Sequence, residues 1–456
     1  MKRNLPALTL LILLPACSLL PRVGPDYQAP IVKAPAVWQT PMPHGGNLAA
    51  LTDWWRQLDD PLLSTLIDAA QRESASLAQA RARIVQARSA AVGAGVAGLP
   101  TLDASLAAKR AAFTFGSPTT FQTTRQAGLM ANWEIDLFGG IARDQEGAEA
   151  RLAATQARWH EARVSVAAET ARLTSALGRA GFSAPAQVAL ATAGAADGAS
   201  TLAELRAERD RQIKALVALT AFDEADLRRQ LASASGRFPR PARFVVDALP
   251  AQLLVQRPDV AAAERDLAAA SAAIGRAAAA RYPRLSLAGS ITPLRLNTDG
   301  SRMSATTWSI GPTLSMPLFD GGRISANVDA ARADYAAAEA AYRQKAREAV
   351  SEVEQALVRL DAAAAREASV QQAASDYRTA FLATEASQRA GFATLIDLEV
   401  TRRTLLAADA NLAAWQQEQV AAWIALYRAV GGGWTRSDTR PDTPIAPQAA
   451  LAGDAQ

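Results

Sequence analysis

The spacing of apolar residues along this chain changes twice from the period of a helix to the period of a strand. From Asp60 to about Gly98, small apolar side chains recur at three- and four-residue steps among Arg, Gln and Glu, which predicts helix. Beyond Pro100, and again beyond Pro283, apolar and polar residues alternate, which predicts strands joined in pairs by loops. The predicted strands cover about 101–110, 127–138, 284–296 and 306–318.

A long helical segment follows each pair of predicted strands. Gly139-Gly140 opens the first segment, and Gly321-Gly322 opens the second, which contains no proline over roughly 60 residues. At about 1.5 Å per residue, the second segment would reach about 100 Å. Such a length is typical of a coiled-coil-like rod and exceeds that of a globular helix.

The two halves of the chain resemble each other. The segment WEIDLFGGIARDQEGAEARLAATQARW corresponds to LSMPLFDGGRISANVDAARADYAAAEAAY at a spacing of about 182 residues. We therefore predict an α+β protein with two internal repeats, at residues 61–236 and 237–434, each made of helix, strand, strand and a long helical hairpin.

The helical hairpin of the first repeat is shorter than that of the second. Counted between matched positions, its two arms lack about 10 and 17 residues, which is roughly 15 to 25 Å of rod. Gly178, Gly181, Pro185 and Gly194 further oppose a continuous helix there. Either the first hairpin ends short of the second, or a local distortion restores the helix phase.

The strand pattern predicts a sheet with one apolar and one polar face. Trp133 and Trp308 should lie on the face toward lipid, and Asn132, Glu134 and Ser309 on the face toward water, as in the wall of a transmembrane β-barrel. A soluble sandwich is the alternative that alternation alone leaves open. Because the smallest known barrel walls use about eight strands, a barrel would require this chain to oligomerise.

The N-terminus has the pattern of an exported lipoprotein. A short apolar run behind Lys2 and Arg3 predicts a signal peptide over residues 1–16, and it ends in Leu-Pro-Ala-Cys, which resembles a bacterial lipobox. We predict a covalent lipid on Cys17, the only cysteine, although a chance cysteine behind a cleaved signal is the alternative. Ser18 favours sorting to the outer membrane.

The segments at the two ends of the mature chain are expected to lie outside the packed repeats. Proline-rich residues 17–60 predict an extended arm behind the lipid anchor, and residues 435–456 predict a disordered tail.

Composition argues against several classes of function. The 456 residues carry a formal net charge of +4 spread over both signs, with no Lys/Arg block suited to nucleic acid. No apolar run beyond the signal peptide is long enough for a transmembrane helix, which argues against a helical transporter. Only two histidines occur, and no metal, nucleophile or phosphate motif can be assembled, so we expect neither an enzyme nor a cofactor besides the lipid on Cys17.

Seven short motifs follow one another between residues 17 and 434. They are VGPDYQAP, WWRQLDDPLLSTLIDAA, WEIDLFGG, QRPDVAAAERDL, PLFDGGR, AGFATLIDLEV and LYRAVGGGW. Their order resembles that of the TolC-like outer-membrane factor family, and in particular its NodT/OprM lipoprotein branch.

The resemblance implies an architecture and a function. The architecture is a homotrimer whose chains each give four strands to one transmembrane β-barrel of about twelve strands, continued into the periplasm by an α-helical barrel. The function is that of a passive exit duct in the cell outer membrane, in a tripartite efflux or type I secretion system. Its partners would be a periplasmic membrane-fusion adaptor, an inner-membrane efflux pump and outer-membrane lipid, and no nucleic acid.

The resemblance also gives roles to the turn of the second helical hairpin. Asp397 matches the first gate aspartate of the family, so three copies would form a ring of carboxylates at the periplasmic end of the duct. The position of the family's second aspartate holds Val400 here. Gly391, Thr394 and Leu395 would form the tip that docks the adaptor.

The first hairpin repeats the same pattern at Gly198, Thr201 and Leu202, which predicts a second docking tip. Plainer explanations stay open for both halves. Asp397 would then be an acid favoured by the helix dipole, and the Gly-x-x-Thr-Leu sequences would be helix stop and restart signals. For the whole chain, the alternatives are a non-conducting trimeric coiled-coil envelope lipoprotein and, less favoured, an envelope enzyme.

Overall fold

The computed structural model describes residues 22–30, 54–58, 60–114, 119–182, 191–233 and 257–434. The predicted signal peptide, Cys17, most of the proline-rich arm and the predicted tail lie outside the described residues. Contacts divide the chain into two compact units. The sheet unit holds Met1–Pro30, Ile84–Ala154 and Ala263–Tyr342, and the helical unit holds Ile31–Arg83, Thr155–Ala262 and Arg343–Gln456.

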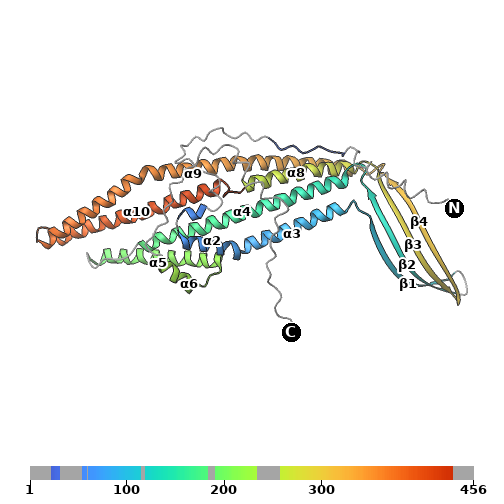
Figure 1. Cartoon of the computed structure of the whole chain (residues 1–456), viewed down its shortest axis with the longest axis horizontal. Coiled ribbons are helices and arrows are strands. Elements are labelled where there is room, and N and C mark those ends of the chain that lie inside the picture. The colour runs from blue at the N-terminus through green and yellow to red at the C-terminus, as the bar shows by residue number, and fades with distance from the viewer. Residues whose placement is uncertain are drawn as a thin grey trace, which may run out of the picture. The chain divides into compact units, whose positions relative to one another are not determined.

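Helices make up most of the described residues (Figure 1). They are η3 (Trp54–Leu58), α2 (Pro61–Glu73), α3 (Ala75–Val96), α4 (Gly140–Phe182), α5 (Ala191–Thr220), α6 (Glu224–Ser233), α8 (Pro258–Ala279), α9 (Arg323–Arg389) and α10 (Leu395–Ala429). Within the part of the chain that is described, none of these helices combines the length and the apolar composition needed to cross a membrane.

The predicted helix between Asp60 and Gly98 is present but divided into α2 and α3. The Asp60 side chain caps α2 by accepting hydrogen bonds from the backbone N–H groups of Leu62 and Leu63, both at 3.0 Å. Ser74 leaves the helical conformation with ψ of 117°, and its hydroxyl lies 2.8 Å from that of Ser76. Serine hydroxyls compete with helical hydrogen bonding, and an apolar period does not reveal such a break.

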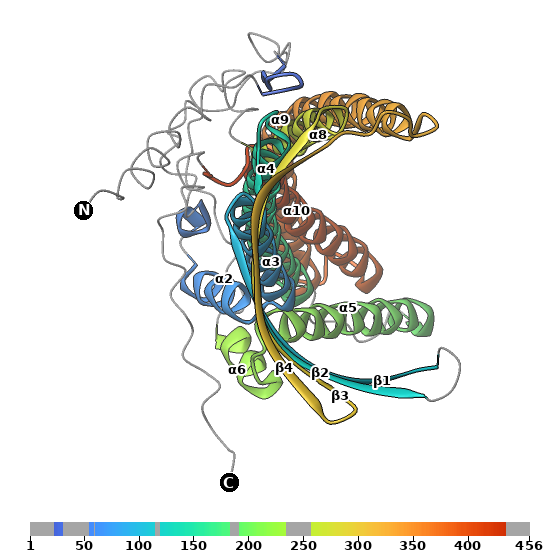
Figure 2. The same cartoon turned by 90° about the vertical axis from the view of Figure 1, so that its right-hand side faces the viewer.

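All four predicted strands are present in the sheet unit, with bounds that differ from the prediction. They are β1 (Thr101–Phe113), β2 (Thr120–Ile135), β3 (Arg284–Thr298) and β4 (Ser301–Ser315), antiparallel in the order β1-β2-β3-β4. The first hairpin extends into the loop predicted between the strands 101–110 and 127–138, at about 113–124, and β2 and β4 end before the predicted residues 138 and 318. Figure 2 shows the four strands as one curved layer.

The register of the strands separates two faces, because paired residues in an antiparallel ladder share a face. Trp133 pairs with Leu287, and Trp308 pairs with Ile291, which puts both tryptophans on the same face. The apolar face comprises Leu102, Leu106, Leu129, Trp133, Leu285, Leu287, Ile291, Trp308, Ile310 and Leu314. The polar face comprises Asp103, Ser105, Asn132, Glu134, Ser286, Ser290, Ser309 and Thr313. The predicted separation of Trp133 and Trp308 from Asn132, Glu134 and Ser309 is therefore confirmed.

The VGPDY segment, residues 23–27, is fastened to the sheet unit by buried charged groups. Arg143 on α4 is 3% exposed and forms an ion pair with Asp26 at 2.7 Å. The Tyr27 hydroxyl donates a hydrogen bond of 2.8 Å to the carboxylate of Glu264 on α8, and burial together with this bond raises the pKa of Tyr27. The first residues described after the predicted lipid anchor are thus held against the unit that carries the strands.

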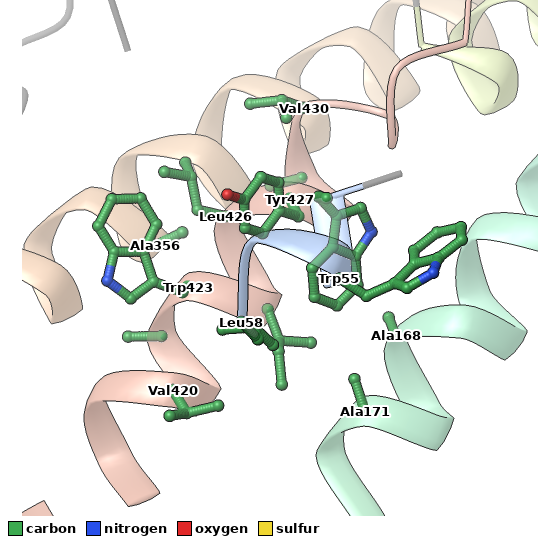
Figure 3. Packing of buried hydrophobic residues seen from close by; sticks show 14 of the residues in the cluster. Trp55, Leu58, Ala168, Ala171, Ala356, Val420, Trp423, Leu426, Tyr427 and Val430 are labelled. Atoms are coloured by element: carbon green, nitrogen blue, oxygen red, sulfur yellow. The ribbon is translucent and has the colours of Figure 1, made fainter. Parts of the chain in front are cut away.

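The core of the helical unit gathers the WW motif with the end of α10 (Figure 3). Trp54 is 2% exposed and stacks on Tyr427, with ring centroids 4.7 Å apart and an interplanar angle of 15°. Figure 3 shows Trp55 and Leu58 of η3 beside Trp423 of α10 and Ala168 of α4. Small alanines on α4 allow this close packing around large aromatic rings.

A second buried centre of the helical unit is Arg257, which opens the QRPD helix α8. Its guanidinium binds the Asp259 carboxylate with two nitrogens, at 3.0 and 2.7 Å, and the Glu352 carboxylate at 2.8 Å. Its remaining terminal nitrogen donates to the carbonyl of Ala429 at 2.8 Å. One side chain therefore ties together α8, α9 and the end of α10.

The GGGW segment that follows α10 requires glycine because its backbone has positive φ angles and because a side chain would clash with a neighbouring residue. Gly431, Gly432 and Gly433 have φ of 86°, 60° and 78°, a region that other residues rarely adopt. A Cβ on Gly432 would lie only 2.6 Å from the Val164 side chain. The tight turn brings Trp434 into a buried cluster with alanines of α4 and α8.

Candidate functional site: the α9–α10 turn and the strand faces

The α9–α10 hairpin is held together along its length by polar contacts between its two helices. The Trp415 indole N–H donates to the carbonyl of Ala363 at 2.8 Å, and this bond is buried. Nearer the turn, Arg378 on α9 pairs with Asp409 on α10 at 2.9 Å. The hairpin is thus a defined support for the turn at its end.

Helix α9 stops at a glycine, as the sequence predicted. Gly391 has φ of 82°, and the backbone N–H of Phe392 donates to the carbonyl of Ser387 at 2.8 Å. This bond spans the turn in the manner of a Schellman motif, which needs a left-handed residue at the position of Gly391.

Helix α10 then begins with a capping box formed by Thr394 and Asp397. The Thr394 hydroxyl accepts a hydrogen bond from the Asp397 N–H at 3.1 Å, and the Asp397 carboxylate accepts from the Thr394 N–H at 2.9 Å and from its hydroxyl at 2.6 Å. The hydrogen bonds from the Thr394 side chain and backbone lower the pKa of Asp397. The helix-start explanation of this acid therefore has a full structural basis.

Two carboxylates near the turn differ in exposure. Asp397 lies at the exposed tip, whereas Glu399 is 6% exposed and pairs weakly with Arg402 at 3.4 Å. Two residues along a helix are about 200° apart, so Glu399 points in another direction from Asp397, in agreement with this difference. Its burial was not predicted, because the sequence places it among polar and apolar residues alike.

The tip also exposes large apolar side chains. Phe392 is 89% exposed, and Leu395, Ile396 and Val400 are 56%, 62% and 58% exposed. Only Leu395 was predicted as a contact. The signal for the others was available in the sequence, since these residues flank a glycine turn, where polar residues are usual.

The first hairpin does not repeat this turn where the sequence predicted it. Gly198, Thr201 and Leu202 lie inside α5, which begins at Ala191, so the prediction of a tip at Gly198 is wrong. Alanines dominate the first turns of α5, and alanine has the highest helix propensity. Helix formation therefore continues through the Gly-x-x-Thr-Leu pattern.

The first hairpin is nevertheless the shorter one in its outgoing helix. Helix α4 has 43 residues and α9 has 67, while α5 has 30 and α10 has 35. Gly178 and Gly181 were expected to oppose a continuous helix, yet α4 runs through both to Phe182. A single glycine costs about 1 kcal/mol in a helix, which a long packed helix tolerates.

Comparison with known proteins supplies the family. The family described as "Outer membrane efflux protein" matches residues 66–180 and 249–432. The chain belongs to this family. The matched residues include both strand hairpins and the α9–α10 turn. The WW motif, Trp54-Trp55, lies outside the matched residues.

Relatives of this efflux protein match it along almost its full length. Nodulation protein T of Rhizobium leguminosarum bv. viciae is 31% identical over 461 residues, covering 94% of each chain. Pyoverdine export outer membrane protein OpmQ of Pseudomonas putida is 31% identical over 471 residues, covering 95% of this chain and 98% of that one. Both relatives agree with the branch that the motifs indicated.

Solved structures agree with the fold. The structure of the outer-membrane channel OprN has a TM-score of 0.77 and 27% identity, covering 90% of this chain and 99% of that one. The Campylobacter jejuni CmeC outer membrane channel also has a TM-score of 0.77, at 21% identity. The efflux protein therefore has the fold of the TolC-like outer-membrane channels, and its place is the outer membrane.

Proposed function

We propose that the chain is one subunit of a homotrimeric exit duct in a tripartite efflux pump. The observation that carries this proposal is the sheet, which has one apolar and one polar face and whose outer strands, β1 and β4, have no partner within the described chain. Unpaired backbone N–H and C=O groups are not tolerated in lipid, so the edges require further strands.

Three copies of the sheet would supply about twelve strands, which is enough to close a transmembrane barrel. Closure would pair β1 of one chain with β4 of the next. The apolar face would then contact lipid and the polar face would line a water-filled lumen, which is the condition for passing polar solutes without catalysis.

The helical hairpin supports the periplasmic part of the proposal. Helices α9 and α10 expose apolar side chains at Val358, Tyr377, Leu382 and Leu406, between 41% and 55% exposed. Exposed apolar side chains repeated along a hairpin are compatible with a partner that covers them. In the proposed trimer, helices of neighbouring chains cover these residues and form the α-helical barrel.

The α9–α10 turn is proposed as both gate and docking tip. Phe392, Leu395 and Ile396 offer an apolar tip to an adaptor, and Asp397 would place three carboxylates around the narrow end of the duct. Hydrogen bonds from Thr394 lower the pKa of Asp397, which favours the charged form of each carboxylate in the ring. We propose no docking role for Gly198, Thr201 and Leu202, since they lie within a helix.

Lipidation of Cys17 is proposed on the lipobox alone. The residue lies outside the described residues, but the VGPDY segment that follows it is fastened to the sheet unit by Arg143 and Glu264. A lipid a few residues before this segment would sit near the strands, where the membrane is.

Cysteine cross-linking combined with conductance tests the duct. The natural chain has a single cysteine, Cys17, so few competing disulfides are expected. One cysteine is introduced in β1 and one in β4 of the same chain, so that β1 of one chain can be linked to β4 of the next. Disulfides between β1 and β4 of neighbouring chains should give covalent trimers, while cysteines in the central strands β2 and β3 should give none.

The same purified trimers should conduct ions in planar bilayers. Trimers without conductance would support the alternative of a non-conducting coiled-coil lipoprotein. Absence of any β1–β4 cross-link would argue against the barrel.

A further inference from the structure

The apolar face of the sheet ends in four arginines. Arg125 on β2 and Arg295 on β3 are direct cross-strand partners. Arg110 on β1 pairs with Thr123, two residues from Arg125, and Arg302 on β4 pairs with Asn297, two residues from Arg295. The four side chains, which we call the arginine cluster, therefore share one face in adjacent rows at the hairpin ends of the strands.

The arginine cluster is exposed and uncompensated. All four residues are exposed, and within the described residues no ion pair is present for any of them. The strands carry Asp103 and Glu134 on the polar face and no acidic residue on the apolar face; Asp299, in the turn between β3 and β4, accepts a hydrogen bond from the Phe121 N–H at 3.0 Å. Like charges directly opposite each other in a sheet are destabilising, with Cβ atoms about 5 Å apart, so the arrangement favours a bound anion.

The position of the arginine cluster matches a membrane interface. Along β2, ten residues separate Ile135, at the helix end, from Arg125. At about 3.3 Å per residue and a tilt of about 40°, this is roughly 25 Å of height, which is the height of the apolar band of a transmembrane barrel. The cluster therefore lies one membrane thickness from the helices.

The immediate surroundings of the arginine cluster combine apolar residues with small polar ones such as Ser304 and Thr306. The row next to Arg125 and Arg295 contains Leu106, 88% exposed, and Pro293. These residues and the two arginines line a shallow pocket of about 770 Å³. The Arg110 guanidinium lies over the Phe121 ring, 5.3 Å from its centroid, which is a favourable cation–π distance. A ligand here meets cationic and apolar groups together.

We infer that the arginine cluster binds the phosphate groups of lipids in the outer leaflet of the outer membrane. The forked guanidinium is suited to bidentate binding of phosphate, and neighbouring Leu106 and Pro293 offer surface to acyl chains, which inorganic phosphate lacks. This inference rests on the proposed duct, because the barrel puts the hairpin ends at the outer leaflet.

The test compares lipid retention by purified trimers. The probe is bisphosphorylated lipid A, with fully dephosphorylated lipid A and inorganic phosphate as comparison ligands, and bound lipid is counted by native mass spectrometry. In the variant with Arg110, Arg125, Arg295 and Arg302 all changed to Gln, retention of the bisphosphorylated lipid should fall at least tenfold. The matched control is Lys109→Gln with Arg284→Gln, which removes strand cations from the polar face and should retain the lipid as the natural chain does.

Three outcomes would overturn the inference. They are equal retention by the fourfold variant and the control, equal retention of the dephosphorylated lipid, and full displacement by inorganic phosphate at a concentration comparable to that of the lipid. Conductance of the same trimers separates this inference from the proposed function. Conducting trimers without arginine-dependent retention would overturn the lipid site alone, whereas lipid-binding trimers without conductance would overturn the duct.

Discussion

Replacing Arg257 by Met should be among the most damaging single changes in the helical unit. The Arg257 side chain is 7% exposed and that of Asp259 is 10% exposed, so the change leaves a buried carboxylate without its partner. Breaking a buried ion pair in this way costs about 3–5 kcal/mol. Glu352 is 54% exposed and stays solvated, so its lost bond adds little.

The magnitude can be assigned to its cause by two companion variants. Arg257→Met combined with Asp259→Asn removes the stranded charge and should recover much of the loss. Arg366→Met is the matched control, because Arg366 makes a similar bond to Glu418, at 2.8 Å, with both side chains at least half exposed. Exposed pairs of this kind are worth about 0.2–1 kcal/mol.

Urea unfolding of the purified protein in detergent, followed by the helical circular dichroism signal, measures these differences as shifts in the midpoint. A shift for Arg257→Met no larger than that for Arg366→Met would refute the assignment of Arg257 as a structural centre. If Arg257→Met combined with Asp259→Asn is as unstable as Arg257→Met alone, the unpaired Asp259 carboxylate is not the cause of the lost stability.

The same pair predicts the direction of a pH dependence. Burial raises the pKa of Asp259, but hydrogen bonding and charge from Arg257 outweigh it, so the pKa lies below its ordinary value. A depressed carboxylate stabilises the folded state above its unfolded pKa of about 3.9, and this stability is lost as the pH falls through the folded pKa. In Arg257→Met burial is opposed only by the weaker effects of the Val260 N–H and of Lys345, so the pKa of Asp259 should rise and the stability deficit of the variant should narrow on acidification.

Further expectations concern the anchor, the sheet and the gate. Mass spectrometry of the mature N-terminus should find an acylated Cys17, and an unmodified start elsewhere would contradict the lipobox. Ile291→Arg on the apolar face should cost about 2–4 kcal/mol and reduce trimer assembly, while Ser290→Arg on the polar face should be tolerated; equal effects would argue for a soluble sheet. Asp397→Asn should reduce cation selectivity in planar bilayers, and Glu399→Gln should leave it unchanged; the reverse order would remove Asp397 from the gate.

The sequence predicted the number of strands and their faces, because alternation is a local signal. It failed at the hairpin ends, where strand β2 extends into a predicted loop around Phe121. Beyond the apolar band both faces of a barrel strand meet polar surroundings, so the alternation that marks a strand fades while the backbone pairing continues.

The two buried centres of the helical unit were not predicted at all. The stacking of Trp54 on Tyr427 and the bond from Arg257 to Ala429 join residues far apart in the chain. These residues belong to motifs that carry the family resemblance. The spacing of residues along the chain does not reveal which distant segments pack against each other. Only the folded chain shows that WW, QRPD and the residues before GGGW serve packing.

The two Gly-x-x-Thr-Leu segments show that a local stop signal allows a helix to end but does not force it to end. Thr201 and Glu204 have the spacing of a capping box, as Thr394 and Asp397 do, yet the first pair lies within α5. Before Thr394 is reached, Gly391 leaves the helical conformation with φ of 82°, whereas every residue from Ala191 to Thr201 is helical. A left-handed residue ends a helix and allows the next one to be capped, and without such a residue a helix tolerates a glycine at a cost of about 1 kcal/mol. A cap therefore takes effect where the helix has already ended, as it has at Gly391 and not between Ala191 and Thr201.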